Sequence, residues 1–177
     1  MFDLLVDLSG RRIDGTGAPN SSGVTAEHWR MRRAPILTPV EVIFPDGTRV
    51  RASSIFERDE AGSYRDFGLY MDPRWAPTWP AEIIDWPDFG LPPDAAQAAA
   101  QVRDAFVRAK SGQVVEVGCL GGLGRTGTVL ACMAVLAGVD SADAVAWVRQ
   151  NYRPRAIETA DQERWVEWFA QNGREVE

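Results

Sequence analysis

The sequence is poor in several residues on which protein chemistry often depends: it has two cysteines, one histidine and one lysine among 177 residues. The two cysteines, Cys119 and Cys132, do not make the disulfide framework of a small secreted domain, so a reducing cytoplasm is the expected compartment. The single histidine, His28, is isolated in "AEHWRMRR". A lone histidine is far more often a surface or partly packed residue than a catalyst, and we give it no role.

Long apolar runs and an excess of basic charge are also missing. No stretch approaches the roughly 20 apolar residues of a membrane span. The start, "MFDLLVDLSG", lacks a basic segment followed by a long apolar core, so no signal peptide is expected. The net charge of −6 argues against binding nucleic acid through a broad basic surface. Nearly all the basic residues are arginines, and Lys110 is the only lysine. This composition fits either bidentate recognition of anions by guanidinium groups or a bias in amino-acid composition, and we favour the bias.

The first part of the chain, residues 1–80, is expected to hold strands and loops. Its first 35 residues are rich in turn formers and are predicted as loop. The stretch "TPVEVIFPDGTRVRASSIF" predicts a β-hairpin, because apolar residues alternate on both sides of the turn Pro45-Asp46-Gly47. The length of the chain fits one domain over residues 1–177.

The second part, residues 81–172, alternates strand and helix patterns. Strands are expected at 66–71, 81–86 and 113–118, and helices at 94–111, 125–138, 141–152 and 159–172. Ser141 is the expected cap of the third helix, and strand 81–86 is a possible neighbour of strand 113–118. These elements predict an α/β fold with a central, mainly parallel sheet flanked by helices and an N-terminal hairpin extension.

The loop between strand 113–118 and the following helix reads "CLGGLGRTG". A loop that enters a helix offers unpaired backbone N–H groups, and the helix dipole adds positive charge there. Gly121, Gly122 and Gly124 allow those amides to converge on one centre, which is a phosphate nest. No lysine follows the last glycine, so the loop is not the nucleotide P-loop.

Cys119 begins this loop, and Arg125 follows six residues later. The amides that bind phosphate would also stabilise a thiolate, and the arginine fork matches two phosphate oxygens. Thr126 offers a hydroxyl to the sulfur as it leaves. The residues together predict covalent phosphoryl transfer. The simpler interpretation, a structural cysteine beside a glycine turn, accounts less well for the whole pattern, although core packing is the expected role of Cys132.

Phosphoryl transfer through cysteine also needs a proton donor and a positioned water. Asp88 in "DWPDFGLPP" lies on a loop hinged by proline and glycine, which could swing over a substrate. Gln162 in "RPRAIETADQERW" lies at the start of a helix, and its amide can both donate to phosphate and accept from water. Each segment alone is also compatible with an ordinary turn or a surface helix.

The three motifs together resemble the protein tyrosine phosphatase superfamily. "CLGGLGRTG" resembles its Cys-x5-Arg-Ser/Thr signature, "WPDFG" its movable acid loop, and "RPRAIETADQ" the glutamine loop of compact bacterial and archaeal dual-specificity-like members. The motifs occur in the family's order over about residues 80–170. The resemblance implies the tyrosine phosphatase fold, with residues 81–172 as its catalytic core.

The resemblance assigns roles to individual positions. Cys119 would be the nucleophile, Asp88 the acid and then the base, and Gln162 the residue that positions water. Thr126 would stabilise the leaving thiolate, and Trp86 would be a hinge of the acid loop. Phosphate would be held by Arg125 and by the loop amides of Leu120, Gly121, Gly122, Leu123, Gly124 and Arg125. The implied activity needs no metal and no other cofactor.

One position departs from the family pattern. The family usually has histidine immediately before the nucleophile, where this chain has Gly118. That histidine orders the loop and tunes the thiolate, so its absence predicts a looser loop or a less stabilised thiolate. The remaining amides, the dipole and Arg125 are expected to preserve activity.

The uncharged loop positions 120–124 bear on the substrate. Family members that act on phosphoinositides tend to have lysines there, so inositol lipids and polyphosphorylated RNA ends are disfavoured. The expected partner is a phosphorylated protein carrying phosphotyrosine, or also phosphoserine and phosphothreonine. Two other functions remain open. One is a pseudophosphatase that binds phosphate without turnover. The other is a sulfur-transfer or arsenate-reductase type of enzyme, in which Asp88 and Gln162 would have no obvious function.

Overall fold

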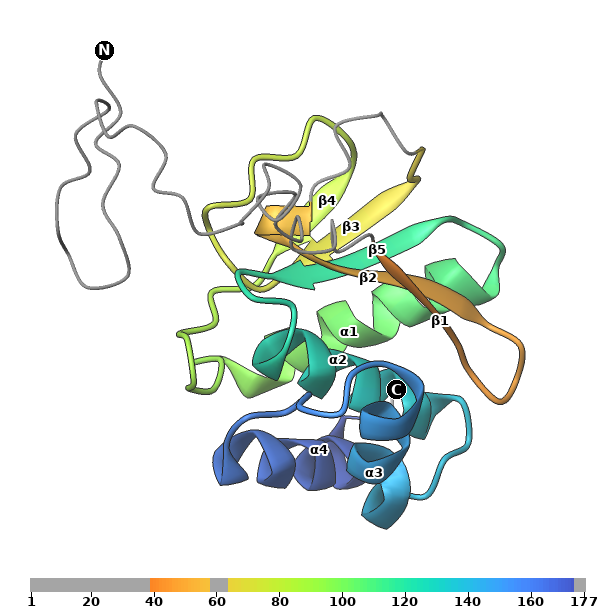
Figure 1. The fold of residues 1–177 in the computed structure, drawn as a ribbon, viewed down its shortest axis with the longest axis vertical. Helices are drawn as coiled ribbons and strands as arrows, with labels where there is room; N and C mark the ends of the chain where they lie inside the picture. Colours follow the sequence, from red (N-terminus) through yellow and green to blue (C-terminus); the bar gives the residue numbers. More distant parts are fainter. Residues whose placement is uncertain (1–38, 58–63, 174–177) are drawn as a thin grey trace, which may run out of the picture. The chain divides into compact units, whose positions relative to one another are not determined.

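The computed structural model describes residues 39–57 and 64–173. The predicted loop 1–35, with His28, lies outside them. Figure 1 shows one five-stranded sheet with the α-helices of the described chain gathered on one side. The strands are β1 (Val40–Ile43), β2 (Arg49–Ser54), β3 (Phe67–Tyr70), β4 (Ala81–Ile83) and β5 (Val115–Cys119), and the helices are α1 (Ala95–Lys110), α2 (Gly124–Leu136), α3 (Ser141–Asn151) and α4 (Ala160–Asn172).

Helices α1, α3 and α4 begin at side chains that accept a hydrogen bond from the first turn, whereas α2 begins after Leu123 without a side-chain cap. Asp94 accepts from the backbone N–H of Gln97 at 2.9 Å, and Thr159 accepts from that of Gln162 at 3.2 Å. The prediction of Ser141 as the cap of α3 is wrong: Asp140 accepts from the N–H of Ala142 at 3.0 Å. A carboxylate one residue earlier is an equally good cap, and it starts the helix at Ser141.

The strand order is β1-β2-β5-β3-β4. The predicted hairpin is present, with β1 antiparallel to β2 and Gly47 in the turn at φ +85°. The pairs β2–β5, β5–β3 and β3–β4 are parallel, so the mainly parallel α/β fold is confirmed. One detail differs: strand 81–83 does not neighbour β5, because β3 lies between them.

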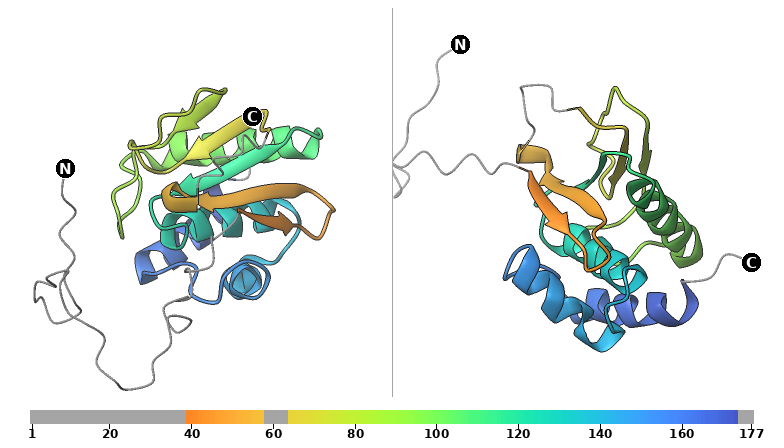
Figure 2. Two further views of the ribbon diagram at one scale, coloured as in Figure 1. Left: turned by 45° about the horizontal axis from the view of Figure 1, so that its top comes forward. Right: turned by 90° about the vertical axis from the view of Figure 1, so that its right-hand side faces the viewer.

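The core lies between the sheet and the helices. Along β5, Val115, Val117 and Cys119 belong to one buried cluster with α1, α2 and α4. Helix α2 is buried along nearly its whole length, since α1, α3, α4 and β5 surround it, as the two views of Figure 2 show. Cys132 is fully buried in this helix, and burial raises the pKa of its thiol, so it is a core residue rather than a reactive one.

The opposite face of the sheet holds a buried polar network. Glu116 accepts hydrogen bonds from Arg65 at 2.9 Å and from the hydroxyl of Tyr70 at 2.8 Å. The indole N–H of Trp79 donates to the same hydroxyl, and the Arg65 guanidinium lies over the Trp79 ring. Burial and the Glu116 charge raise the pKa of Tyr70, so its hydroxyl stays protonated and donates to Glu116.

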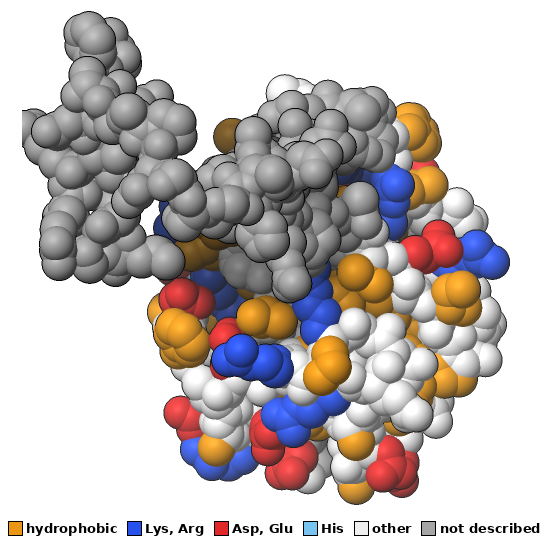
Figure 3. All heavy atoms as spheres, in the orientation of Figure 1, with side chains coloured by type: hydrophobic (Ala, Val, Ile, Leu, Met, Phe, Trp, Pro, Cys, Tyr) orange, Lys and Arg blue, Asp and Glu red, His pale blue; other side chains and the backbone are white. Residues whose placement is uncertain are grey.

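The surface drawn in Figure 3 mixes charges of both signs, with arginine and lysine side chains beside aspartate and glutamate over the helices. Among the described residues, no helix has the length and apolar character that crossing a membrane requires.

Candidate active site

The glycine loop lies at the carboxyl end of the parallel strands. Cys119 is the last residue of β5 and Gly124 the first of α2, so the four residues between them connect a buried strand to a helix N-terminus. Ligands of open α/β sheets bind at this edge. The strand and helix predicted on either side of the loop are both present, which gives the loop its rigid supports.

The loop's carbonyl oxygens are bonded to the surrounding protein. The oxygen of Leu120 accepts from the N–H of Ile55, that of Gly122 accepts from the Tyr152 hydroxyl at 2.6 Å, and that of Leu123 accepts from the N–H of Gly127. Fixing the carbonyls outward leaves the amides of the loop to serve an anion. The sequence analysis missed Ile55 and Tyr152, which lie far from the loop in the chain.

The sulfur of Cys119 lies inside this loop. The N–H of Gly122 donates to it at 3.2 Å. Gly122 has φ +63°, and a Cβ there would lie 3.1 Å from the carbonyl oxygen of Ser53, so both the backbone conformation and the space require glycine. This backbone donor fixes the position of the sulfur within the loop.

Arg125 lies in the first turn of α2 with only 3% of its side chain exposed. Its Nη1 donates to the carbonyl oxygens of Met71 and Trp86 at 2.7 and 2.8 Å. Its Nη2 contacts the carboxylates of Asp72 at 3.3 Å and Asp88 at 3.0 Å. Its Nε is buried without a hydrogen-bond partner in the described structure. Two of the three guanidinium nitrogens are therefore bonded to protein groups, and Nε remains without a partner within the described residues.

The segment between β4 and α1, which was predicted to be the acid loop, reaches this guanidinium through Asp88. Asp88 is half exposed and pairs with Arg125, although β4 is two strands from β5. Trp86 is buried, donates its indole N–H to the carbonyl oxygen of Gly90 at 2.8 Å, and packs edge-on against Trp165 of α4. Phe89 has φ +57°, an uncommon conformation for a large side chain. The loop is thus anchored at Trp86 and tightly turned around Asp88.

Asp72 is a site residue that the sequence analysis missed. Its buried carboxylate accepts from the backbone N–H and the Nε of Arg74, and its second oxygen accepts from Nη2 of both Arg74 and Arg125. These hydrogen bonds from Arg74, with the nearby Arg125 charge, lower the pKa of Asp72 to about 2. The available signal was its place immediately after a buried strand, at the edge where ligands bind.

Thr126 follows Arg125 in α2 and is fully buried. Its hydroxyl has no hydrogen-bond partner in the described part of the chain. The hydroxyl of Thr128, by contrast, donates back to the carbonyl oxygen of Gly124 at 2.8 Å. Thr126 is therefore a buried donor without a partner at the start of α2, within the part of the chain that the structure describes.

Gln162 lies against the start of α2. Its Oε1 accepts from the N–H of Glu158 at 2.9 Å, while its Nε2 is buried with no partner among the described residues. A Cβ on Gly124 would lie 3.0 Å from both amide atoms and 2.5 Å from the Glu158 carboxylate. The structure therefore brings Gln162 to the loop, with one unused donor.

Arg149 of α3 holds the segment that precedes Gln162. Its Nε donates to the carbonyl oxygen of Ala156 and its Nη2 to that of Ile157, each at 3.0 Å, and Nη2 also pairs with Glu163. Ile157 has φ +64°, which is unfavourable for a β-branched residue. The arginine secures a strained turn that sequence reasoning did not detect.

Gly118 has a steric explanation. It lies beside Tyr70 across the β3–β5 pair, and a Cβ on it would lie 2.9 Å from the Trp75 ring and 3.1 Å from the carbonyl oxygen of Ser53. The Trp75 ring is buried and stacks on Tyr70 with ring centres 4.0 Å apart. Trp75 therefore fills the space that a side chain at 118 would need.

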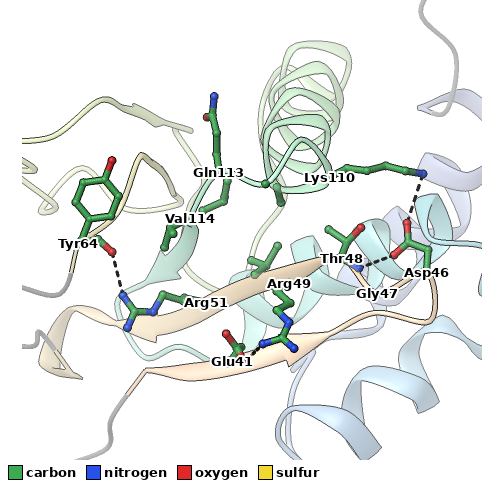
Figure 4. Close-up of a pocket in the computed structure, with 14 residues that line it drawn as sticks. Glu41, Asp46, Gly47, Thr48, Arg49, Arg51, Tyr64, Lys110, Gln113 and Val114 are labelled. Carbon is green, nitrogen blue, oxygen red and sulfur yellow. Dashed lines mark hydrogen bonds and ion pairs between the residues drawn. The ribbon is translucent and has the colours of Figure 1, made fainter.

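A large pocket of about 860 Å³ lies elsewhere, at the amino ends of β2 and β5 (Figure 4). Its charged groups are paired within the pocket: Lys110 with Asp46, Arg49 with Glu41, and Arg51 with the carbonyl oxygen of Tyr64. It contains none of the predicted site residues. Among the described residues, no group of three or more histidine, cysteine, aspartate or glutamate side chains is arranged to hold a metal.

Part of the chain is similar to a family of known proteins. The family described as "Swiss Army Knife protein, DSP-PTPase phosphatase domain" matches residues 90–166, which include Cys119, Arg125 and Gln162 but not Asp88. Two uncharacterised proteins of Methanocaldococcus jannaschii are 36% and 35% identical, over 55% of this chain and over 71% and 66% of their own lengths.

Solved structures share the fold. Tk-PTP in its active form aligns with a TM-score of 0.54 at 24% identity, covering 61% of this chain and 80% of its own. Kinase associated phosphatase, with its catalytic cysteine changed to serine, gives 0.54 at 18% identity, covering 63% and 72%. A leucine-rich-repeat and phosphatase-domain protein of Entamoeba histolytica gives 0.56 at 11% identity, covering 77% and 93%.

The chain belongs to the protein tyrosine phosphatase superfamily. Its match within that superfamily is to the dual-specificity type of phosphatase domain.

Proposed function

We propose that the protein hydrolyses phosphate monoesters on proteins, at phosphotyrosine and also at phosphoserine or phosphothreonine, through a cysteinyl-phosphate intermediate. The observation that carries the proposal is the Cys119–Arg125 loop. It combines a sulfur that accepts a backbone N–H with a buried guanidinium whose Nε is unpartnered. A nucleophile and an oxyanion clamp in one rigid loop suit phosphoryl transfer.

In the first step, the Cys119 thiolate attacks phosphorus, the S–P bond forms, and the bond from phosphorus to the ester oxygen breaks. The loop amides and Arg125 bind the three non-bridging oxygens. Asp88 transfers its proton to the departing oxygen. Because Asp88 now contacts Nη2 of Arg125, it occupies a donor that a bound phosphate would use. Substrate binding would therefore free the carboxyl group to turn towards the leaving oxygen.

In the second step, water attacks the phosphorus of the cysteinyl phosphate, and the thiolate leaves. Asp88, now ionised, takes a proton from that water. The unpartnered Nε2 of Gln162 would orient the attacking water against the phosphoryl group, and the unpartnered hydroxyl of Thr126 would donate to the leaving sulfur. Nε of Arg125, the Thr126 hydroxyl and Nε2 of Gln162 would thus each acquire a partner during the cycle. No metal or other cofactor enters either step.

The test measures phosphate release from a small aryl phosphate in the presence of a metal chelator. The pH is varied over about 4.5–8, which spans the range in which general acids and bases change protonation state. Cys119→Ser is expected to abolish turnover, and Asp88→Asn to lower kcat about 100-fold and remove the fall in rate at high pH. Cys132→Ala is the matched control, because that cysteine lies in the core. It should stay active.

Two outcomes would contradict the proposal. Turnover that survives in Cys119→Ser would exclude the cysteine mechanism. Absence of turnover in the wild type, with vanadate still bound at the loop, would indicate a pseudophosphatase that recognises phosphoproteins.

The two free, buried cysteines keep the cytoplasm as our expected location.

A further inference from the structure

Arg74 lies beside the proposed site and has no part in the mechanism above. It follows β3 in the segment Asp72-Pro73-Arg74-Trp75, and its side chain is 58% exposed. Asp72 holds it through three hydrogen bonds of 2.8–3.0 Å, one from its backbone N–H and two from the guanidinium. A long exposed side chain fixed at this many points has lost the conformational freedom that arginine usually keeps on a surface.

The same carboxylate oxygen binds Arg125. Oδ2 of Asp72 accepts from Nη2 of Arg74 at 2.8 Å and from Nη2 of Arg125 at 3.3 Å. One buried carboxylate therefore sets two guanidinium groups side by side. The Arg125 side chain is 3% exposed, whereas that of Arg74 is 58% exposed.

Asp88 lies near Arg74, because Nη2 of Arg125 contacts both Asp88 and the Asp72 oxygen that binds Arg74. The pKa of Arg74 is raised, first by its hydrogen bonds to Asp72 and further by the charges of Asp72 and Asp88. The acid loop and the Arg74 guanidinium thus lie within electrostatic reach of each other. A substrate whose phosphate contacts Arg125 would present its adjoining groups to this rim.

We propose that Arg74 is a specificity residue that binds the carboxylate of an acidic side chain next to the phosphorylated residue of a peptide substrate. The inference rests on the proposed function and adds the class of substrate. Nη1 of Arg74 and its outward edge have no partner within the described residues, and a guanidinium offers a carboxylate two parallel donors. Successive residues of an extended peptide are about 3.8 Å apart, so a flanking carboxylate would reach the rim while the phosphate fills the loop.

The experiment uses two short phosphotyrosyl peptides that differ only in the residues flanking the phosphotyrosine, aspartate and glutamate in one and asparagine and glutamine in the other. We expect wild type to prefer the acidic peptide by about fivefold in kcat/KM, mostly through KM, and to lose the preference as salt increases. Arg74→Gln should bring the ratio close to one, and Arg74→Lys should restore part of it. Arg49→Gln, an exposed arginine of the hairpin, is the matched control and should keep the wild-type ratio.

A wild-type ratio near one, or a ratio that survives in Arg74→Gln, would overturn the inference. A separate arm measures equilibrium binding of both peptides to Cys119→Ser and to Cys119→Ser/Arg74→Gln, with no turnover needed. If wild type hydrolyses neither peptide nor an aryl phosphate, the proposed function fails, and binding still decides the role of Arg74. Tighter binding of the acidic peptide to Cys119→Ser, but not to Cys119→Ser/Arg74→Gln, supports the inference. An equal preference in both variants, or no binding of either peptide to either variant, overturns it.

Discussion

Asp72 is the residue on which the charges of the site converge. Its carboxylate orients Arg125 from behind and fixes Arg74 at the rim, and the carbonyl oxygen of the same residue accepts from the N–H of Trp75. Two cations share one buried anion, so removing that anion leaves Arg125 without one of its fixed partners. The position of the guanidinium, and not only its presence, depends on Asp72.

Asp72→Asn is expected to lower the free energy of unfolding by about 2 kcal/mol at pH 7, because charge-assisted hydrogen bonds become neutral ones. The folded-state pKa of Asp72 is about 2, below the value of 3.8 for an exposed carboxyl group. Its contribution is therefore complete above pH about 5 and is lost as the pH falls towards 2. Urea unfolding from pH 7 to pH 3 should show the gap between wild type and variant narrowing.

The matched control for this experiment is Asp104→Asn. Asp104 pairs with Arg108 on the exposed face of α1, and such pairs contribute about 0.5 kcal/mol or less. A difference between wild type and Asp72→Asn that stays constant over this pH range would show that Asp72 acts by packing rather than by charge.

At the scale of residues, the sequence predicts an arrangement of side chains only where the residues that lie together in space are also close in the chain. Cys119, the glycines and Arg125 lie within seven consecutive residues, so the loop could be predicted from its spacing. Asp72 and Arg74 lie about fifty residues earlier, and their contacts depend on β3 pairing with β5. No local pattern contains that pairing.

At the scale of elements, two segments bring side chains to the loop, and they are held differently. The segment that carries Asp88 depends on the Trp86 ring and its hydrogen bond to the carbonyl oxygen of Gly90. The segment before α4 depends on Arg149, a side chain from a different helix. Helix and strand positions were predicted well because capping residues and β-branched runs are local signals. The Arg149 contact could not be predicted, because it requires the packing of α3 against α4.

Arg149→Gln is expected to release the strained turn at Ile157 and to displace Gln162 from the start of α2. Because Gln162 is proposed to act only on the intermediate, its hydrolysis should slow while formation continues. We expect kcat for an aryl phosphate to fall about tenfold, kcat/KM to change little, and a burst of the aryl product to appear in stopped-flow measurements.

Arg164→Gln serves as the control for Arg149→Gln. Arg164 is an exposed residue of α4 that pairs with Asp161. It should show no burst and an unchanged kcat. An equal loss of kcat and kcat/KM in Arg149→Gln would mean that the turn supports the first step instead.

At the scale of the whole molecule, the sheet separates two kinds of interior. The helical side is an apolar core around α2, and the other side holds the polar network of Glu116, Arg65, Tyr70 and Trp79. The sequence predicted the first from apolar periodicity. It did not predict the second, since a glutamate within a β-branched run looks like an interruption until its partners Arg65 and Tyr70 are known.

Glu116→Gln is expected to lower the free energy of unfolding by about 3 kcal/mol, because it leaves the Arg65 charge almost buried without its anion. The matched control is Glu41→Gln, which breaks the pair with Arg49, where both side chains are more than half exposed, and should cost less than about 1 kcal/mol. Urea denaturation of the three proteins measures both differences. Equal effects of the two substitutions would show that the network contributes no more than a surface pair.

Gly118 and Trp75 also have a consequence for how relatives of this chain are recognised. The indole ring from the loop after β3 occupies the volume above residue 118, so the two positions cannot both carry large side chains. A sequence pattern that requires histidine before the cysteine would miss every chain in which a tryptophan ring occupies the space of that side chain. Among homologues, a small residue at the first position and an aromatic one at the second should be inherited as a pair, and their joint occurrence would mark this branch of the superfamily.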